Sequence, residues 1–322
     1  MSTKELYNKF KIKASNKNKY DAGLRDLFGC VEKNIKEHGH EPMANRNIIP
    51  NKGHVVSQDP ENYPATDHLF ELKAHYKIED FKRNFVLIIE DMEVGYEGYV
   101  RHCIPNVKKL ITQFRESKLP IVWTNWSRRH DDGHYNAVDR YYGPQAVTEG
   151  TNPCYIAGED GIDTVAELAP QTQDEYSCSI DSLHLSKFAD LDDDGREILF
   201  PMLEAWGVNT IVLCGAWTDD CLLTTIFDAV DKYGYDLILV RDGVATATVW
   251  GDPILEALMA STCCDMTCEG IVKHLKEHPD LVEAPKAPLN GNVYKTKTNY
   301  REDRMQKEID ALKERIKELE AK

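Results

Sequence analysis

The sequence predicts an α/β domain built on a mainly parallel β-sheet. Short apolar runs rich in branched side chains recur along the chain, at 84–90, 120–124, 211–214 and 237–241. Such runs are typical of strands that are buried on both faces of a parallel sheet. Polar residues follow several of these runs directly. Since open α/β sheets bind ligands at the carboxyl ends of their strands, we expect a functional site at that rim.

Composition narrows the classes of protein to consider. A chain of 322 residues and 36.7 kDa is long enough for one large domain with extensions. A formal net charge of −15 and a pI near 5.2 argue against partners such as nucleic acid or an anionic membrane. No apolar run is long enough to span a membrane, and the first residues lack an apolar signal core. Nine cysteines without regular spacing favour a reducing compartment, so we expect a cytoplasmic protein.

Three regions are predicted from the distribution of strands and turns. Residues 1–80 lack the alternation of strands and helices and form an N-terminal extension, whereas 81–285 form the catalytic domain. The remainder, 286–322, is predicted to be a linker followed by an amphipathic helix. The apolar residues of that helix step by four and three, as in a coiled coil, and a contact between subunits is slightly favoured over packing on the same subunit. They are Met305, Ile309, Leu312, Ile316 and Leu319, and they predict a homo-oligomer.

Cys221 is the first candidate for a catalytic residue. The apolar run 211–214 predicts a buried strand, which Gly215 ends in a sharp turn. Thr218 is predicted to cap the next helix, with 219–220 in its first turn. Cys221 would then lie near a helix N-terminus, where the helix dipole and free N–H groups favour a thiolate and an oxyanion. A buried structural cysteine is the alternative.

Two further residues complete a reactive set. Lys187 is the one lysine between Lys118 and Lys232, and it precedes Cys221 by 34 residues. It could also be a solvated surface charge. Asp91 directly follows the strand predicted over 84–90, which places its carboxylate on the same rim as the cysteine. A carboxylate, an ammonium and a thiol suit nucleophilic catalysis, since the base accepts the thiol proton and the cation stabilises the thiolate.

The cluster of Cys263, Cys264 and Cys268 invites a zinc interpretation. No second pair of ligands follows at the distance typical of a zinc finger, so a structural role is favoured. We expect this segment to form the last buried strand, followed by a helix over 269–275.

Ordered signals along the chain resemble the isochorismatase-like cysteine hydrolases, a family with nicotinamidases, N-carbamoylsarcosine amidase, biuret and triuret hydrolases and ureidoacrylate amidohydrolase. The resemblance covers roughly 81–282. It implies a three-layer α/β/α sandwich on a six-stranded, mainly parallel sheet, here with an N-terminal arm and a C-terminal helix. The matching residues are Asp91 after the first strand, Lys187 before the cysteine, Gly215, Thr218 and Cys221 in G-x-x-T-x-x-C, Thr225, Asp228 and Ala229 in T-x-x-D-A, and Asp242 after a further strand.

The resemblance also implies a mechanism that needs no cofactor. Asp91 would take the proton of Cys221, and Lys187 would stabilise the thiolate that attacks an amide carbonyl. The peptide between Ala216 and Trp217 would be cis, as in the family, and backbone N–H groups around this turn would hold the oxyanion.

The sequence departs from the family pattern in two places. Glu93 stands where family members have Gln, which would put a carboxylate near the pocket mouth. Asn125 and Ser127 stand where nicotinamidases carry metal ligands, so we expect no metal. His130 and His134 lie nearby, but no carboxylate-histidine spacing supports them as ligands.

Trp126, Tyr142 and Tyr155, together with Glu93, fall where family members build the substrate pocket, although each aromatic could equally serve packing. We therefore expect an amidohydrolase that cleaves a C–N bond of a small amide or of a ureide or carbamoyl compound through a thioester. The alternatives are a nicotinamidase-like hydrolase of aromatic amides and a non-enzymatic assembly protein on the same fold.

Overall fold

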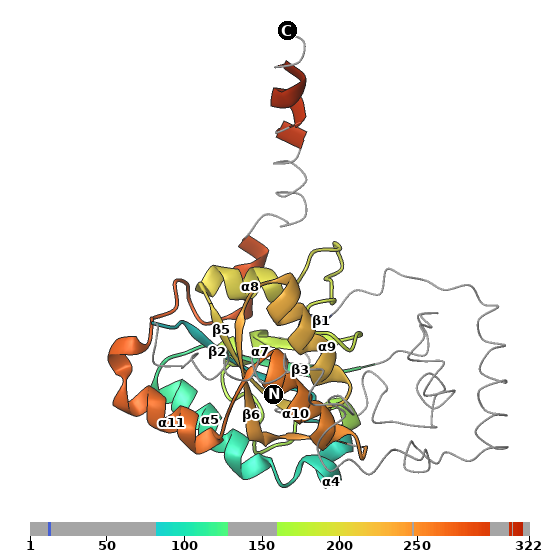
Figure 1. The fold of residues 1–322 in the computed structure, drawn as a ribbon, viewed down its shortest axis with the longest axis vertical. Helices are drawn as coiled ribbons and strands as arrows, with labels where there is room; N and C mark the ends of the chain where they lie inside the picture. The colour runs from blue at the N-terminus through green and yellow to red at the C-terminus, as the bar shows by residue number, and fades with distance from the viewer. Residues whose placement is uncertain are drawn as a thin grey trace, which may run out of the picture.

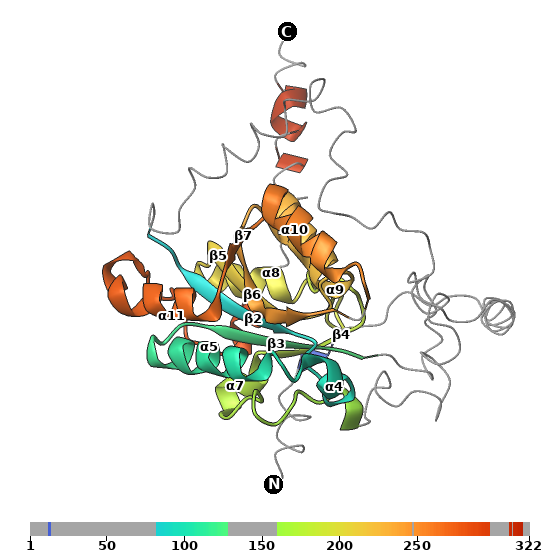
Figure 2. The ribbon, with the colours of Figure 1, turned by 60° about the horizontal axis from the view of Figure 1, so that its bottom comes forward.

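The computed structural model of the protein describes residues 12–13, 82–127, 160–246, 248–296, 309–310 and 312–317. A parallel sheet runs through the centre of the domain (Figures 1 and 2). Its strands lie in the order β1-β4-β3-β2-β5-β6-β7, and all neighbouring pairs in this described sheet are parallel. They are β1 (Ile12–Lys13), β2 (Phe85–Glu90), β3 (Ile121–Trp126), β4 (Ser179–Ser182), β5 (Thr210–Ala216), β6 (Asp236–Ala245) and β7 (Cys264–Met266).

Helices cover both faces of this sheet. Helices α5 and α11 lie side by side on one face, and α8, α9 and α10 lie on the other (Figure 2). The helices are α4 (Glu97–Val100), α5 (Ile104–Glu116), α7 (Gln173–Ser177), α8 (Leu199–Trp206), α9 (Cys221–Phe227), α10 (Gly251–Ser261) and α11 (Cys268–Glu277). Shorter 3₁₀ or π segments are η4 (Val94–Tyr96), η7 (Asp160–Ile162), η8 (Asp228–Lys232), η9 (Pro279–Leu281) and η10 (Gly291–Thr296).

This architecture confirms the predicted three-layer α/β/α sandwich. Strands β2 to β7 make up the predicted six-stranded sheet, although none of the predicted runs corresponds to β4. The two-residue β1 adds a seventh strand beside β4. Every residue of β2, β3 and β5 is buried. Continuous apolar runs are expected in such strands, because a parallel sheet with helices on both faces leaves neither side of the strand to water.

The turn between β5 and α9 differs from the sequence prediction. Thr218 does not cap the helix: α9 begins at Cys221, and the preceding Asp220 makes no capping hydrogen bond through its side chain. The hydroxyl of Thr218 instead donates to the carbonyl of Ala245 at 3.1 Å. That carbonyl is available because β6 continues past Asp242, its predicted end, after a shift of register against β5.

The last strand is shorter and less buried than the sequence predicts. Strand β7 covers Cys264–Met266, and its residues are half-buried or exposed because it forms the edge of the sheet. Helix α11 begins at Cys268 and ends at Glu277, so it is longer than the predicted 269–275. Thr267 caps it by accepting a hydrogen bond from the Gly270 N–H at 3.2 Å.

The segment from 286 onward, predicted to be a linker, packs on the sheet domain. The N–H of Lys286 donates to the Trp206 carbonyl at 2.8 Å, and the indole N–H of Trp206 donates to the Pro288 carbonyl at 2.9 Å. Val293 and Tyr294 are buried in the hydrophobic core. The domain therefore uses residues up to η10 as part of its packing.

The C-terminal helix is described at 309–310 and 312–317, where it stands away from the sheet domain (Figures 1 and 2). Its side chains Ile309, Leu312 and Ile316 are 42%, 63% and 53% exposed. Met305 and Leu319 lie outside the described residues, as do residues 1–80 apart from β1. The contact between subunits stays a prediction. Within the described residues, no helix is long and apolar enough to cross a membrane.

Candidate active site

The carboxyl ends of β2 and β5 bring the predicted catalytic residues together. The two strands are neighbours, and Glu90 at the tip of β2 pairs with Gly215. Asp91 follows β2 with a φ of 53°, a left-handed conformation that is uncommon for a residue other than glycine. Successive side chains of a regular strand point to opposite faces. The left-handed turn at Asp91 ends this alternation, so two consecutive carboxyl groups reach the same site.

Asp91 and Lys187 form a buried ion pair. Lys187 Nζ lies 2.7 Å from Asp91 Oδ2, and the two side chains are 0% and 1% exposed. Lys187 comes from the loop between β4 and α8, where its backbone N–H donates to the hydroxyl of Thr225 at 3.2 Å. Its ammonium also donates to the His184 carbonyl at 3.3 Å. The structure therefore places Lys187 inside the site rather than on the surface.

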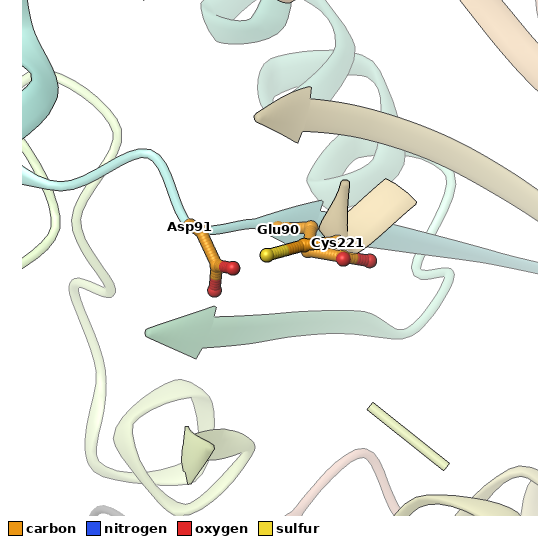
Figure 3. A group of neighbouring side chains, drawn as sticks. All are labelled: Glu90, Asp91 and Cys221. Carbon is orange, nitrogen blue, oxygen red and sulfur yellow. The ribbon is translucent and has the colours of Figure 1, made fainter. Parts of the chain in front are cut away.

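Cys221, the first residue of α9, completes the group. Its Sγ, a carboxyl oxygen of Asp91 and a carboxyl oxygen of Glu90 lie within 4.8 Å of one another. Figure 3 shows the sulfur directed toward the Asp91 carboxyl group. Cys221 is 2% exposed. The structure thus gathers a thiol, a carboxyl group and an ammonium at one site, the set that nucleophilic catalysis by a thiol requires.

Burial and neighbouring charges together shift the pKa values of the three groups. Burial alone would lower the pKa of the Lys187 ammonium, but the charge of Asp91 and smaller contributions from Cys221, Glu90 and Asp190 raise it above its ordinary value. Burial raises the pKa of Asp91, opposed by the Lys187 charge and by hydrogen bonds. The pair keeps its charges because each supplies the other with a counter-ion.

The pKa of the Cys221 thiol differs from the sequence prediction. A helix N-terminus and a lysine were expected to lower the pKa of Cys221, but burial raises it well above its ordinary value despite the charge of Lys187. Asp91 adds to the increase because a negative charge disfavours a second one nearby. The thiol of the resting protein is therefore neutral, and thiolate formation requires a base.

The backbone before Cys221 has the expected form. The Ala216–Trp217 peptide is cis, as the resemblance implied. Gly215 has a φ of 128°, and a Cβ at this position would lie 1.9 Å from the Glu90 carbonyl oxygen, so only glycine fits between the strands. Asp219 fixes the other end of the turn, since its carboxylate accepts hydrogen bonds from the hydroxyls of Thr246 and Thr248.

The residues at the nicotinamidase metal positions serve the protein's own hydrogen bonds. The Asn125 amide donates to the Ile162 carbonyl at 2.8 Å, and the Ser127 N–H donates to the Ser182 carbonyl at 2.8 Å. His130 and His134 lie outside the described residues.

Glu90, Asp91 and Cys221 have a spacing that metal ligands also use. The Lys187 ammonium 2.7 Å from Asp91 occupies the place of a cation there and would repel another.

Two of the predicted substrate residues, Glu93 and Trp126, lie within the described residues. Glu93 is completely buried, as Asp91 and Lys187 are, and its place near the pocket mouth stays a prediction. Its backbone forms a bridge with Thr164, which draws the residue into the domain. Trp126 is the last residue of β3 and is also buried. Tyr142 and Tyr155 lie outside the described residues, and their roles stay predictions.

Sequence reasoning missed the residue that holds the lysine loop. Asp190 is completely buried, and its carboxylate accepts hydrogen bonds from the Ser182 hydroxyl, the Leu183 N–H and the His184 ring. These bonds fix the turn from which Lys187 projects. The S-x-H-x-x-K-x-x-D spacing carries no signal of its own, because the partners are found only when the loop has folded.

Aromatic side chains beside the cis peptide were also missed. The ring of Trp217 lies 4.8 Å from that of Tyr96 and 5.5 Å from that of Tyr99, measured between centroids. Tyr96 is buried, whereas Tyr99 is 61% exposed. The turn before the cysteine thus continues into an aromatic cluster that reaches the surface.

The comparisons agree with this fold. The model of the isochorismatase domain family matches residues 80–267, more than half of the chain, and the chain belongs to that family. A protein of Arabidopsis thaliana described as a probable inactive nicotinamidase is 26% identical over 174 residues, which cover 52% of this chain and 83% of that protein.

Two solved structures illustrate the fold. A cysteine hydrolase from Pseudomonas syringae pv. phaseolicola superposes with a TM-score of 0.52 at 20% identity, over 60% of this chain and 92% of the other. The N-carbamoylsarcosine amidase of Thermoplasma acidophilum is similar at 23% identity and a TM-score of 0.44, over 58% of this chain and 97% of the other. The superposition on the cysteine hydrolase agrees with the α/β fold described above.

Proposed function

We propose that the protein is a cysteine-dependent amidohydrolase that cleaves a C–N bond, other than a peptide bond, in a small amide or in a ureide or carbamoyl compound. The observation that carries this proposal is the buried Asp91–Lys187 ion pair beside the Cys221 thiol. Burying an ion pair is costly and stabilises a fold poorly, so its presence next to a nucleophile favours a catalytic role.

The first half of the reaction forms a thioester. Asp91 accepts the proton of Cys221, and the sulfur attacks the substrate carbonyl carbon. The oxyanion receives hydrogen bonds from backbone N–H groups at Trp217 and Cys221, the donors that we assign to it. The C–N bond then breaks, and the leaving nitrogen takes the proton from Asp91, so that ammonia or an amine departs.

The second half releases the enzyme. Asp91, again a carboxylate, takes a proton from water, and the hydroxide attacks the thioester carbonyl carbon. The C–S bond breaks, the acid product leaves, and the proton returns to Cys221. Lys187 keeps its charge throughout, because the site holds one negative charge at every stage: on the Asp91 carboxylate, the thiolate or the oxyanion of the tetrahedral intermediate. The chain's own residues supply these groups, and we expect no cofactor.

A ureide or carbamoyl substrate is favoured over nicotinamide because Asn125 and Ser127 replace the metal ligands of nicotinamidases. Nicotinamide is the second candidate, favoured by the name of the Arabidopsis thaliana relative. The word "inactive" in that name makes a non-enzymatic role the third, and the exposed C-terminal helix would fit assembly. The seven described cysteines are all free thiols, which supports a cytoplasmic location.

The test is a panel of small amides and ureides, nicotinamide among them, assayed for release of ammonia or amine. Cys221→Ala is expected to abolish turnover, whereas Cys264→Ala, a substitution of a half-buried thiol on β7, keeps it. Intact-mass spectrometry after rapid quenching should find the acyl group on Cys221. Turnover that survives Cys221→Ala would overturn the thioester mechanism. No turnover with any compound would favour the non-enzymatic alternative.

A further inference from the structure

Glu90 is a second carboxyl group in the site, and the proposed reaction does not use it. It is the last residue of β2 and is completely buried. A carboxyl oxygen of Glu90 lies within 4.8 Å of both the Cys221 sulfur and an Asp91 oxygen. Figure 3 shows the three side chains gathered at the strand tips.

The contacts of Glu90 differ from those of Asp91. Glu90 Oε1 accepts a hydrogen bond from the Thr225 hydroxyl at 3.1 Å, while Oε2 has no hydrogen-bond partner among the described residues. The short ion pair of Lys187 is made with Asp91 instead, at 2.7 Å. Glu90 therefore lacks the hydrogen bonds and the close counter-ion that a buried carboxylate needs.

We propose that Glu90 is a positioning residue that stays protonated in the resting protein, so that the single positive charge of Lys187 is left for Asp91 and for the thiolate of Cys221. The inference rests on the proposed function only for its effect on turnover. Its effect on the thiol is measurable without any substrate.

Counting the charges that face Glu90 supports this assignment. Lys187 is the cation of the cluster. Asp91 and Asp190 carry carboxyl groups, and Cys221 becomes negatively charged when it ionises. Burial raises the pKa of Glu90 well above its ordinary value, and the charge of Asp91 adds to the increase although Lys187 opposes it. A protonated Glu90 leaves the charges of Lys187 and Asp91 balanced, while the Asp190 carboxylate is held by its hydrogen bonds from Ser182, Leu183 and His184. An ionised Glu90 would add a further negative charge to this buried cluster.

The same count of charges determines how readily the Cys221 thiol ionises. When Asp91 takes the thiol proton, the negative charge moves from the carboxylate to the sulfur, and Lys187 stabilises it there. An ionised Glu90 within 4.8 Å would repel that charge and raise the thiol pKa further. The protonated form thus permits thiolate formation at neutral pH.

The experiment measures iodoacetamide alkylation of Cys221 against pH in the full chain, wild type and Glu90→Gln, with the modified peptide quantified by mass spectrometry. Glutamine mimics the neutral acid. At neutral pH we expect the two rates to agree within about twofold, well below the tenfold effect of one pKa unit. At alkaline pH Glu90→Gln should react faster, because wild-type Glu90 then ionises. Glu197→Gln, which changes another buried glutamate, should follow wild type throughout.

Alkylation of Glu90→Gln that is about tenfold or more faster at neutral pH would overturn the inference, since it would mean that Glu90 is already a carboxylate there. An equally large decrease would also overturn it, since it would mean that Glu90 assists ionisation of the thiol. A second measurement tests the inference on wild type alone, in case Glu90→Gln does not fold. Infrared spectra of wild type with isotope-labelled glutamate should contain the C=O band of a buried protonated carboxyl group, and its absence would also overturn the inference.

Turnover separates this inference from the proposed function. With an active substrate, Glu90→Gln should keep its activity at neutral pH and retain it to higher pH than wild type. If no compound of the panel is turned over while alkylation and the infrared band behave as expected, the proposed function fails and the state of Glu90 stands.

Discussion

The two ends of strands β2 and β5 carry buried polar clusters of opposite character. At the amino end, the Arg83 guanidinium donates to the Thr210 hydroxyl at 3.1 Å and to the Asp236 carboxylate at 2.5 Å. Asn84 adds hydrogen bonds to the side chain of Asn209 and to the Trp206 carbonyl. Arg83 is buried, but the Asp236 side chain is 47% exposed, so this ion pair still reaches water.

At the carboxyl end the ion pair does not reach water. Asp91 and Lys187 are both buried, and Glu90 and Cys221 add two more ionisable groups around one cation. The amino end shows what a structural cluster needs, which is hydrogen-bond acceptors for its buried donor groups and a charge that reaches solvent. The surplus of acidic groups at the carboxyl end has no equivalent benefit for stability, and this contrast favours a chemical role there.

The largest effect is expected from Lys187→Met, which removes the one cation that the described residues place in the carboxyl-end cluster. Without the ammonium, burial raises the pKa of Asp91 further, so the carboxyl group is protonated at neutral pH and cannot accept the thiol proton. We expect kcat/KM on an active substrate to fall by about 10³–10⁴-fold. Lys273→Met, on the exposed face of α11, is the control and should match wild type.

Much of this site was predictable from the sequence, because the carboxyl ends of parallel strands meet at one rim. Asp91 directly follows one apolar run, and Cys221 follows the turn after another. The structure brings both together with Lys187. Glu90 was not predictable as a site residue. A strand would turn its side chain away from that of Asp91, and only the left-handed φ of Asp91 brings the two to one side.

Other differences arise from burial, which sequence patterns show poorly. The rise in the Cys221 pKa depends on complete enclosure by surrounding elements, not on its place at a helix terminus. The segment 286–296 has the composition of a linker, yet Val293 and Tyr294 are enough to dock it. Both cases depend on contacts between segments far apart in the chain.

The second-largest effect is expected from removing the docked segment 286–296, which contacts the amino-end cluster. The Trp206 carbonyl accepts hydrogen bonds from both Asn84 and Lys286, so 286–296 is tied to the amino-end cluster. Truncation after Pro288 removes Val293 and Tyr294 from the core and should lower the free energy of unfolding by about 3 kcal/mol or more, measured by urea denaturation.

Truncation after Thr296 is the matched control, because it removes only the C-terminal helix. Stability and Cys221 alkylation should be unchanged, while the mass measured by light scattering falls, since the exposed Ile309, Leu312 and Ile316 are predicted to contact a second copy. An unchanged mass at every concentration would contradict the predicted contact between subunits. Equal stability of the two truncated chains would show that the docked segment contributes nothing to the amino end.

Arg83→Met should lower stability and leave the chemistry unchanged. The substitution removes hydrogen bonds to Thr210 and Asp236, and the free energy of unfolding should fall by about 1–3 kcal/mol. The loss is moderate because the half-exposed Asp236 can be hydrated. The activity of the folded fraction, measured below the unfolding transition, should equal that of wild type. A fall in kcat like that of Lys187→Met would erase the distinction between the two ends.

The smallest effect is the dependence of stability on pH in Glu90→Gln. A raised pKa in the folded state means that folded wild type holds its proton when the unfolded chain, near its ordinary pKa of about 4.3, has lost it. The stability that Glu90 contributes is therefore complete below that value and is lost as pH rises toward the folded-state pKa.

Glutamine does not titrate, so the stability of Glu90→Gln relative to wild type should increase with pH above this point, by at most about 1.4 kcal/mol per pH unit for one proton. Asp91 is present in both proteins, and its own titration largely cancels in the difference. Urea denaturation of the two proteins between mildly acidic and neutral pH measures this quantity. Parallel stability curves would mean that Glu90 ionises in the folded protein as it does in the unfolded chain, and the carboxyl end would then hold a second buried negative charge.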